Sequence, residues 1–270
     1  MSSTLIWTVV VLAALGIVLS SVLYLVARKF AVKEDPRLDA VESELPGANC
    51  GGCGSAGCRD FAKKCVEAGS LEGCFCPVGG NEVMKKVAAV LGVEAVEQAP
   101  RVAVVRCNGS CANRPRTNVF EGYPSCRVQA SLYRGETMCS YGCLGCGDCV
   151  EACPSGALSM NAGTLLPEVD SSKCTACGAC VKACPRGIIE LRVKGPVRVW
   201  VDCVNKDKGA VARKACSAAC IGCGKCAKLC ESSAITLQDN LAWIDSDKCA
   251  QCTKCVSECP TGAIHKSQEA

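Results

Sequence analysis

The cysteines of this chain carry its strongest chemical signal, because their spacing repeats. The chain has 28 cysteines in 270 residues, and most of them fall into runs of the form C-x-x-C-x-x-C-x-x-x-C. The runs consist of Cys143, Cys146, Cys149 and Cys153; Cys174, Cys177, Cys180 and Cys184; Cys220, Cys223, Cys226 and Cys230; and Cys249, Cys252, Cys255 and Cys259. Thiolates at this spacing bind [4Fe–4S] cubane clusters in bacterial two-cluster ferredoxins. The sequence therefore predicts iron–sulfur clusters and the transfer of single electrons.

In a two-cluster ferredoxin, the fourth cysteine of each run binds the cluster of the other run. This cross-ligation predicts one pair of clusters from the first two runs and another pair from the last two. The predicted ligand sets are Cys143, Cys146 and Cys149 with Cys184; Cys174, Cys177 and Cys180 with Cys153; Cys220, Cys223 and Cys226 with Cys259; and Cys249, Cys252 and Cys255 with Cys230.

Disulfides and zinc explain these cysteines less well. A small secreted protein can hold this much cysteine in disulfides. However, runs of closely spaced cysteines make poor disulfide partners, and the membrane topology predicted below places them in a reducing compartment. Structural zinc sites use two separated cysteine pairs, so zinc has no need of the third cysteine that every run contains.

A second type of cysteine site precedes the runs and consists of Cys50, Cys53, Cys58 and Cys76. The glycines between the first three let the backbone curl tightly and aim N–H groups at sulfur. These four cysteines therefore predict one further [4Fe–4S] cluster. The same loop, at residues 52–57, matches the dinucleotide-binding fingerprint G-x-G-x-x-G. No predicted strand precedes it and two of its neighbours are cysteines, which argues against a Rossmann site.

The cysteines between these two groups have irregular spacing and allow two assignments. The first is a cluster held by Cys107, Cys111, Cys126 and Cys139. In the second, one cubane is held by Cys139, Cys143, Cys149 and Cys184, while Cys107, Cys111 and Cys126 recruit Cys203 or Cys216. Either assignment gives about six [4Fe–4S] clusters. Cys65 and Cys74 are predicted to be free thiols, buried as small apolar groups.

Short elements must position these ligands. The pattern predicts helices at 59–68 and 81–91, a buried strand at 102–105, and strands at 157–160, 188–191, 234–237 and 241–244, with a hairpin turn at Asp239–Asn240. Aromatic residues are only 4% of the chain, so the apolar core is thin. The clusters must therefore hold these domains together, and the protein without iron should be largely unfolded.

The N-terminal segment predicts a membrane anchor. Leu5 to Ala27 is uncharged and apolar, and as a helix it is roughly 34 Å long, enough to span a bilayer. Arg28, Lys29 and Lys33 follow it, and no Lys or Arg precedes it. The positive-inside rule then places the N-terminus outside and the rest of the chain in the cytoplasm. A cleaved signal peptide fits poorly, because the segment lacks a basic start and a cleavage site.

The expected fold is α+β, with a single N-terminal transmembrane helix, a small four-cysteine iron–sulfur domain and tandem two-cluster ferredoxin-like modules. The predicted divisions are an anchor (1–28), a linker (29–46), the four-cysteine domain (47–100), an intermediate cysteine-containing region (101–140) and two ferredoxin-like pairs (141–200 and 201–270).

The charge pattern points to a protein partner. The formal net charge is +4, but six clusters at about −2 each would make the loaded protein acidic, so the basic residues are no sign of nucleic acid binding. Basic residues concentrate between Lys173 and Lys214, where they either offset cluster charge or receive an acidic ferredoxin. The predicted docking residues are Lys206, Lys208, Arg213 and Lys214.

The order of the motifs resembles a known family. After the anchor come GANCGGCGSAGC with CPVGG, then VAVVRCNGSC, then CSYGCLGCGDCVEACP and the ferredoxin repeats. This order resembles the iron–sulfur B subunit of the Rnf electron-transport complex, from the anchor to about residue 230, and the second ferredoxin pair resembles the longer members. The chain differs at Glu231, where a proline is expected, and at Cys146, where an apolar residue is often expected.

The resemblance implies a role within a larger complex. Such complexes oxidise reduced ferredoxin, reduce NAD⁺ and drive Na⁺ or H⁺ across the membrane, with flavin and NAD sites on other subunits. This chain would be an electron-transfer subunit with no catalytic substrate site of its own, and His265 would be a surface residue. The alternatives are a membrane-tethered polyferredoxin that serves a hydrogenase or dehydrogenase without ion pumping, and a metal-binding module with no redox role.

Overall fold

The computed structural model describes residues 2–29, 35–95, 97–195 and 197–268. Its first helix, α1, spans Ser2–Lys29, and within it Ile6–Lys29 is long and apolar enough to cross a membrane. The described side chains of α1 are exposed. An apolar helix with such a surface is stable when lipid covers its side chains. The predicted N-terminal apolar helix is thus confirmed and is compatible with a membrane anchor. Lys33, part of the topology prediction, lies outside the described residues.

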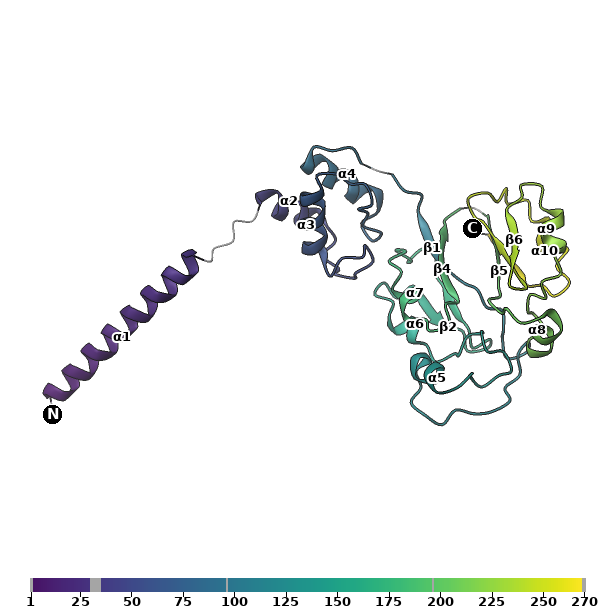
Figure 1. The fold of residues 1–270 in the computed structure, drawn as a ribbon, viewed down its shortest axis with the longest axis horizontal. Coiled ribbons are helices and arrows are strands. Elements are labelled where there is room, and N and C mark those ends of the chain that lie inside the picture. The colour runs from purple at the N-terminus through teal and green to yellow at the C-terminus, as the bar shows by residue number, and fades with distance from the viewer. Residues whose placement is uncertain (1, 30–34, 96, 196, 269–270) are drawn as a thin grey trace.

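The four-cysteine domain is built on three helices, α2 (Pro36–Glu44), α3 (Cys58–Ala68) and α4 (Gly80–Leu91). Figure 1 shows them gathered in a unit of their own, apart from the strands. Their apolar faces share one core, which includes Val41, Phe61 and Val87. Helices α3 and α4 both end at a glycine in the left-handed region, a common helix C-cap. These two helices confirm the predictions for 59–68 and 81–91.

The predicted linker is wrong over residues 36–45. Helix α2 begins at Pro36, and the Asp35 side chain accepts a hydrogen bond from the backbone N–H of Arg37 at 2.9 Å. Proline at the first helical position and aspartate at the N-cap both favour a helix start. Leu38, Val41 and Leu45 are buried in the core of the four-cysteine domain. This segment therefore belongs to that domain.

The strands form four antiparallel pairs in the described residues. The pairs are β1 (Arg101–Val105) with β4 (Ile189–Val193), β2 (Leu158–Met160) with β3 (Pro167–Val169), β5 (Val197–Val201) with β8 (Ile264–Gln268), and β6 (Ile235–Gln238) with β7 (Leu241–Ile244). Asp239 and Asn240 both have positive φ, as a two-residue hairpin turn requires. The strands predicted from the sequence are all present, shifted by one residue or less at their starts.

Short helices connect the strands. They are α5 (Cys126–Leu132), α6 (Asp148–Glu151), α7 (Ala179–Ala183), α8 (Gly209–Ala215), α9 (Lys225–Leu229) and α10 (Lys254–Ser257). Each run of cysteines wraps the start of one short helix, α6, α7, α9 or α10. The mixed helix and strand content and the tandem modules confirm the predicted α+β class.

Strand pairing redraws the limits of the two modules. Strand β1, predicted in the intermediate region, pairs with β4 of the first module at Arg101↔Val193 through Val105↔Ile189. Strand β5 lies almost entirely within the predicted first pair, yet it pairs with the C-terminal strand β8. Each module therefore begins with a strand that pairs with its own last strand. Module 1 runs from β1 to β4, and module 2 from β5 to β8 (Figure 1).

The two modules meet where β1 and β5 end. The Trp200 indole N–H donates to the Val105 carbonyl at 3.3 Å, and the Asn108 N–H donates to the Asp202 carbonyl at 3.1 Å. The buried Arg106 side chain donates to the carbonyls of Val201 and Cys203, both at 3.3 Å. These bonds fix the loop after β1 against the loop after β5.

The assignment of α2 to the four-cysteine domain can be tested with a pair of neighbouring substitutions. Val41 is 0% exposed, so Val41→Asp buries an unpaired carboxylate and should destabilise this domain by roughly 3 kcal/mol. Ala40→Asp places the same charge on the exposed face of α2. Limited proteolysis of the full chain should cut residues 36–95 faster in the first variant only. If both variants resist proteolysis equally well, residues 36–45 are a linker and do not belong to the four-cysteine domain.

Candidate metal centres

The four cysteines of the N-terminal site surround one cavity. Cys50, Cys53, Cys58 and Cys76 all line it, together with residues from the start of α3 and the preceding loop. The Asn49 side chain accepts from the Cys58 N–H at 2.8 Å and so caps the start of α3. The Gly79 N–H donates to the Cys76 sulfur at 3.4 Å. The structure thus brings together every residue of this predicted ligand set.

The N-terminal site lies against module 1. The Lys182 ammonium on α7 donates to the Gly51 carbonyl at 3.0 Å. A Cβ at Gly52 would lie 2.6 Å from the carbonyl oxygen of Cys177, so this close approach requires glycine. Gly52 and Gly54 belong to the fingerprint-like motif, whose loop connects α2 to α3 and carries the cluster cysteines. The glycines therefore allow two cysteine loops to touch.

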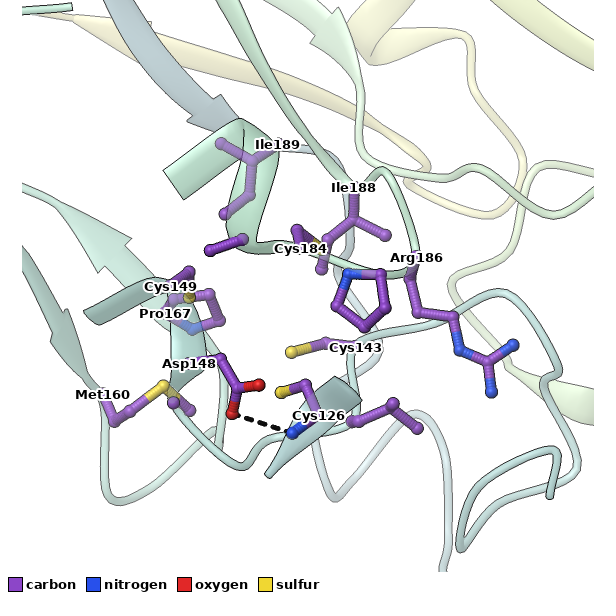
Figure 2. A pocket seen from close by; sticks show the side chains of 14 residues that line it. Cys126, Cys143, Asp148, Cys149, Met160, Pro167, Cys184, Arg186, Ile188 and Ile189 are labelled. Carbon is purple, nitrogen blue, oxygen red and sulfur yellow. Dashed lines mark hydrogen bonds between the residues drawn. The ribbon is translucent and has the colours of Figure 1, made fainter. Parts of the chain in front are cut away.

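A second cavity lies in module 1, and its cysteines differ from the predicted set. Cys126, Cys143, Cys149 and Cys184 line it. Figure 2 shows the sulfur atoms of Cys126 and Cys143 pointing into the cavity, with Cys149 and Cys184 on its far side. Cys146, which the spacing of the run predicted as a ligand, is absent from the lining. Cys126, which the sequence assigned to another set, lines the cavity instead.

Asp148 explains how Cys126 reaches this cavity. Its carboxylate accepts from the Cys126 N–H at 2.8 Å (Figure 2). It also accepts from the Arg127 N–H at 3.1 Å and from the Ser125 hydroxyl at 2.8 Å. These donors form the start of α5, so Asp148 caps that helix from another part of the chain. Burial of the carboxyl group raises its pKa, whereas the hydrogen bonds from the start of α5 lower it. The hydrogen bonds outweigh burial, so the pKa of Asp148 lies below its usual range.

Cys146 does not line the cavity, although it is a direct neighbour of Cys126. Its sulfur lies 3.6 Å from the side-chain oxygen of Gln129 on α5. Burial, followed by the neighbouring Cys126, raises the pKa of Cys146 to about 12. Sequence spacing gave no signal for this exchange, since Cys126 lies 17 residues before Cys143.

The cysteines of the other ferredoxin runs lie near one another, and their ligand sets stay predictions. Burial, and then the charges of Cys174, Cys177 and Cys153, raise the pKa of Cys180 to about 11. That combination is the predicted cross-ligated set. In module 2, one cavity is lined by Cys220, Cys223, Cys226 and Cys259. Cys249 and Cys252 lie near Cys255, and Cys230 packs against the same core as Cys255.

Backbone N–H groups donate hydrogen bonds to the sulfurs of several cysteines in the runs. The Ala157 N–H donates to the Cys153 sulfur at 3.3 Å, and the Ala263 N–H donates to the Cys259 sulfur at 3.3 Å. The Ala103 N–H of β1 donates to the Cys174 sulfur at 3.5 Å. Such bonds stabilise negative charge on sulfur and tune the potential of an iron–sulfur cluster.

The structure divides the set Cys107, Cys111, Cys126 and Cys139, which the sequence suggested as one cluster. Cys126 belongs to the cavity of Figure 2. Cys111 is exposed, with its sulfur 3.8 Å from the Thr164 carbonyl. Cys107 and Cys139 line another cavity, at the junction of the modules. Cys139 also does not line the cavity of Cys143, Cys149 and Cys184, so the cavity gives the second assignment no support at that residue.

The remaining sequence predictions concern side chains outside the cavities. Cys65 and Cys74 are buried in the core of the four-cysteine domain, as predicted. Lys206, Lys208, Arg213 and Lys214 are all exposed on α8 and the loop before it, and Lys206 forms an ion pair with Asp239 at 3.3 Å. His265 on β8 is partly exposed, its ring centroid is 4.7 Å from that of Trp200, and its Nδ1 is 3.4 Å from Asp202.

The donor chemistry fits iron–sulfur clusters. Four thiolates around one zinc ion lie about 3.8 Å from each other, given a Zn–S distance near 2.3 Å. No group of three or more metal-binding side chains in the described residues is close enough to hold a single ion. The cysteines instead surround cavities in sets of four, with N–H groups aimed at sulfur. That arrangement suits a larger cluster with one thiolate at each corner.

The fold and these sites define an iron–sulfur protein with tandem dicluster modules, and comparisons with known proteins agree. A 4Fe-4S dicluster domain family matches residues 142–188 and 219–263, and a second such family matches 173–234. A family model for an Fe-S cluster matches residues 45–75.

Relatives identify the family. The chain is 44% identical to the B subunit of the proton-translocating ferredoxin:NAD(+) oxidoreductase complex of Clostridium ljungdahlii, over 97% of this chain and 92% of the relative. It is 43% identical to the B subunit of the Na(+)-translocating ferredoxin:NAD(+) oxidoreductase complex of Acetobacterium woodii, over 94% and 75%. It is 42% identical to the B subunit of the ion-translocating oxidoreductase complex of Methanosarcina acetivorans, over 98% and 99%. The chain belongs to this family of B subunits, which confirms the resemblance to the Rnf complex.

The exchange of Cys126 for Cys146 can be tested by single substitutions. We expect Cys146→Ser to keep the full iron content, because its sulfur lies outside the cavity. Cys126→Ser should lose up to one cluster, about four irons per chain. Asp148→Asn should weaken the same site without removing a thiol. Iron and sulfide analysis of anaerobically purified protein measures all three. Iron loss in Cys146→Ser with none in Cys126→Ser would restore the ligand set that the spacing predicted.

Proposed function

We propose that this chain takes single electrons from reduced ferredoxin and carries them through cytoplasmic clusters to the other subunits of a membrane complex. That complex would couple ferredoxin oxidation and NAD⁺ reduction to Na⁺ or H⁺ transport. The observation that carries the proposal is the series of four-cysteine cavities in a chain of this family. A [4Fe–4S] cluster, when bound, supplies a carrier of one electron. Flavin and NAD would bind elsewhere in the complex.

Three cavities, together with the cysteine neighbours of Cys180 and Cys255, support a ligand assignment for five clusters. The proposed sets are Cys50, Cys53, Cys58 and Cys76; Cys126, Cys143, Cys149 and Cys184; Cys153, Cys174, Cys177 and Cys180; Cys220, Cys223, Cys226 and Cys259; and Cys230, Cys249, Cys252 and Cys255. Contact between Gly52 and Cys177 brings the first set against module 1. Such contact favours electron exchange between the two sites, because it brings their cysteine loops side by side.

The surface of α8 is the proposed docking site for ferredoxin. Lys208, Arg213 and Lys214 are exposed, and no salt bridge involves them in the part of the chain that the structure describes. Lys206 is partly neutralised by Asp239, so the other three carry the larger share of the positive potential. Exposed Val211 lies among them. A basic surface of this kind steers an acidic partner toward the protein and speeds its association.

The anchor gives the proposed orientation. Arg28 and Lys29 form the last turn of α1, which favours a cytoplasmic position for that end. The clusters would then face the compartment that contains soluble ferredoxin and NAD⁺. Other subunits of the complex would receive the electrons at or near the membrane.

Charge reversal tests the docking site. We expect Lys208→Glu, Arg213→Glu and Lys214→Glu together to slow reduction by ferredoxin about tenfold or more at low salt, and to flatten its salt dependence. Stopped-flow spectroscopy at several ionic strengths measures both, and a small neutral reductant should still reduce the protein at the normal rate. The control reverses Lys63, Lys64 and Lys86, which are exposed on α3 and α4. Slower reduction in the control alone would move docking to the four-cysteine domain.

Reporter fusions test the orientation. An alkaline phosphatase joined after Ala270 should be inactive, because that enzyme folds only outside the cytoplasm, whereas a fluorescent protein at the same position should be bright. Phosphatase activity from full-length protein would contradict the cytoplasmic placement.

A further inference from the structure

A cavity at the junction of the two modules has four cysteines in its wall. Cys107, Cys139, Cys203 and Cys216 line it, together with Arg114 and Asn205. Cys139, Cys203 and Cys216 are buried, with 7%, 8% and 7% of their surface exposed. The ferredoxin-type sets assigned above use none of these four residues. They come from segments up to 109 positions apart (Cys107 to Cys216), so their convergence is a property of the fold.

The four cysteines occupy matching positions in the two modules. Cys107 comes two residues after β1 ends, and Cys203 comes two residues after β5 ends. Cys139 lies four residues before Cys143, and Cys216 lies four residues before Cys220. Each module therefore contributes one cysteine after its first strand and one just before its first cysteine run. The cavity lies between two equivalent halves and takes two thiols from each.

The hydrogen bonds around these sulfurs resemble those of the other sites. The Cys143 N–H donates to the Cys107 sulfur at 3.5 Å, and the Asn205 N–H donates to the Cys203 sulfur at 3.4 Å. The Asn205 side-chain amide donates to the Cys139 sulfur at 3.5 Å. Asn205 is only 1% exposed and thus links one sulfur from each module. Donors placed in this way stabilise thiolates.

A guanidinium group adds positive charge to the same cavity. Arg114 lines the wall, and its Nε is buried without a hydrogen-bond partner in the described residues. A Cβ at Gly109 would lie 3.0 Å from that Nε and 3.3 Å from the Cys107 sulfur, so glycine leaves room for both. A buried N–H with no partner is costly. A negatively charged group bound among the cysteines would supply what Arg114 lacks.

We infer that Cys107, Cys139, Cys203 and Cys216 hold a further [4Fe–4S] cluster, with two thiolates from each module. This site joins the two modules. Its cluster accepts an electron from one module and then donates that electron to the other, so it returns to its starting oxidation state. The inference rests on the proposed electron-transfer function. It also gives the basic surface of α8 a nearby destination, because α8 ends at Ala215 and Cys216 follows it directly. Cys111, exposed and outside this cavity, is excluded from the set.

Iron analysis of serine variants tests the site. We expect Cys203→Ser and Cys216→Ser each to lose up to about four irons per chain, or to convert one cluster to a form with a new EPR signal. Cys111→Ser is the matched control and should retain the wild-type content. Full iron and an unchanged EPR spectrum in both junction variants would overturn the inference. Iron loss in Cys111→Ser would overturn it in favour of the set suggested by the sequence.

A milder substitution guards against loss of folding. Asn205→Asp keeps the side-chain oxygen that accepts from the Asp207 N–H at 2.7 Å, but it replaces the donor to Cys139 with an acceptor. We expect full iron content and a lower reduction potential for one cluster in an EPR-monitored titration. Potentials that all match wild type would contradict a cluster at this site. Wild-type protein with almost no iron would instead refute the proposed function itself.

Discussion

Burial of thiols that must be charged to bind metal is the constraint that governs this protein. Burial is the largest influence on these cysteines, and it raises the pKa of Cys149 and Cys203 to about 12 and that of Cys226 and Cys255 to about 11. Without a compensating charge, such groups are neutral at pH 7 and line apolar cavities. Iron reverses this preference, because a coordinated thiol loses its proton outright. Folding, deprotonation and cluster binding are therefore one coupled equilibrium.

The small apolar cores make this coupling stronger. Within the described residues, the sheets of each module have two strands, and such sheets are marginally stable when isolated. Cysteines form a large part of both module cores, among them Cys143, Cys149 and Cys180 in module 1 and Cys220, Cys226 and Cys255 in module 2. A cluster bound to these residues replaces the side-chain packing that a larger domain would use. The bonds from Trp200, Arg106 and Asn205 then fix one module against the other.

Local patterns in the sequence predicted much of this fold. The cysteine runs identified the ferredoxin modules, and the turn at Asp239–Asn240 and the apolar strand after Arg101 were visible because each depends on adjacent residues. The set of Cys50, Cys53, Cys58 and Cys76 was also visible, since a single short helix separates its members. Interactions between residues that are close in the sequence can be predicted from the spacing of residue types.

The errors arose where distant segments meet. Helix α2 looked like a linker because its stretch of sequence is charged and contains prolines. The burial of Leu38, Val41 and Leu45 depends on packing against α3 and α4, which the local sequence does not reveal. Spacing favoured Cys146 over Cys126, but the bonds from α5 to Asp148 bring Cys126 into the cavity. The junction of β1 and β5 brings Cys107 close to Cys203. Strand pairing across the chain determines that junction, and no local pattern records it.

Mössbauer spectroscopy of intact, anaerobically purified protein, combined with iron and sulfide analysis, shows whether the buried cysteines act in sets of four on cubane clusters. We expect about 24 irons and 24 sulfides per chain, with all of the iron in [4Fe–4S] environments. Eight or fewer irons per chain, or zinc in place of iron, would contradict this expectation.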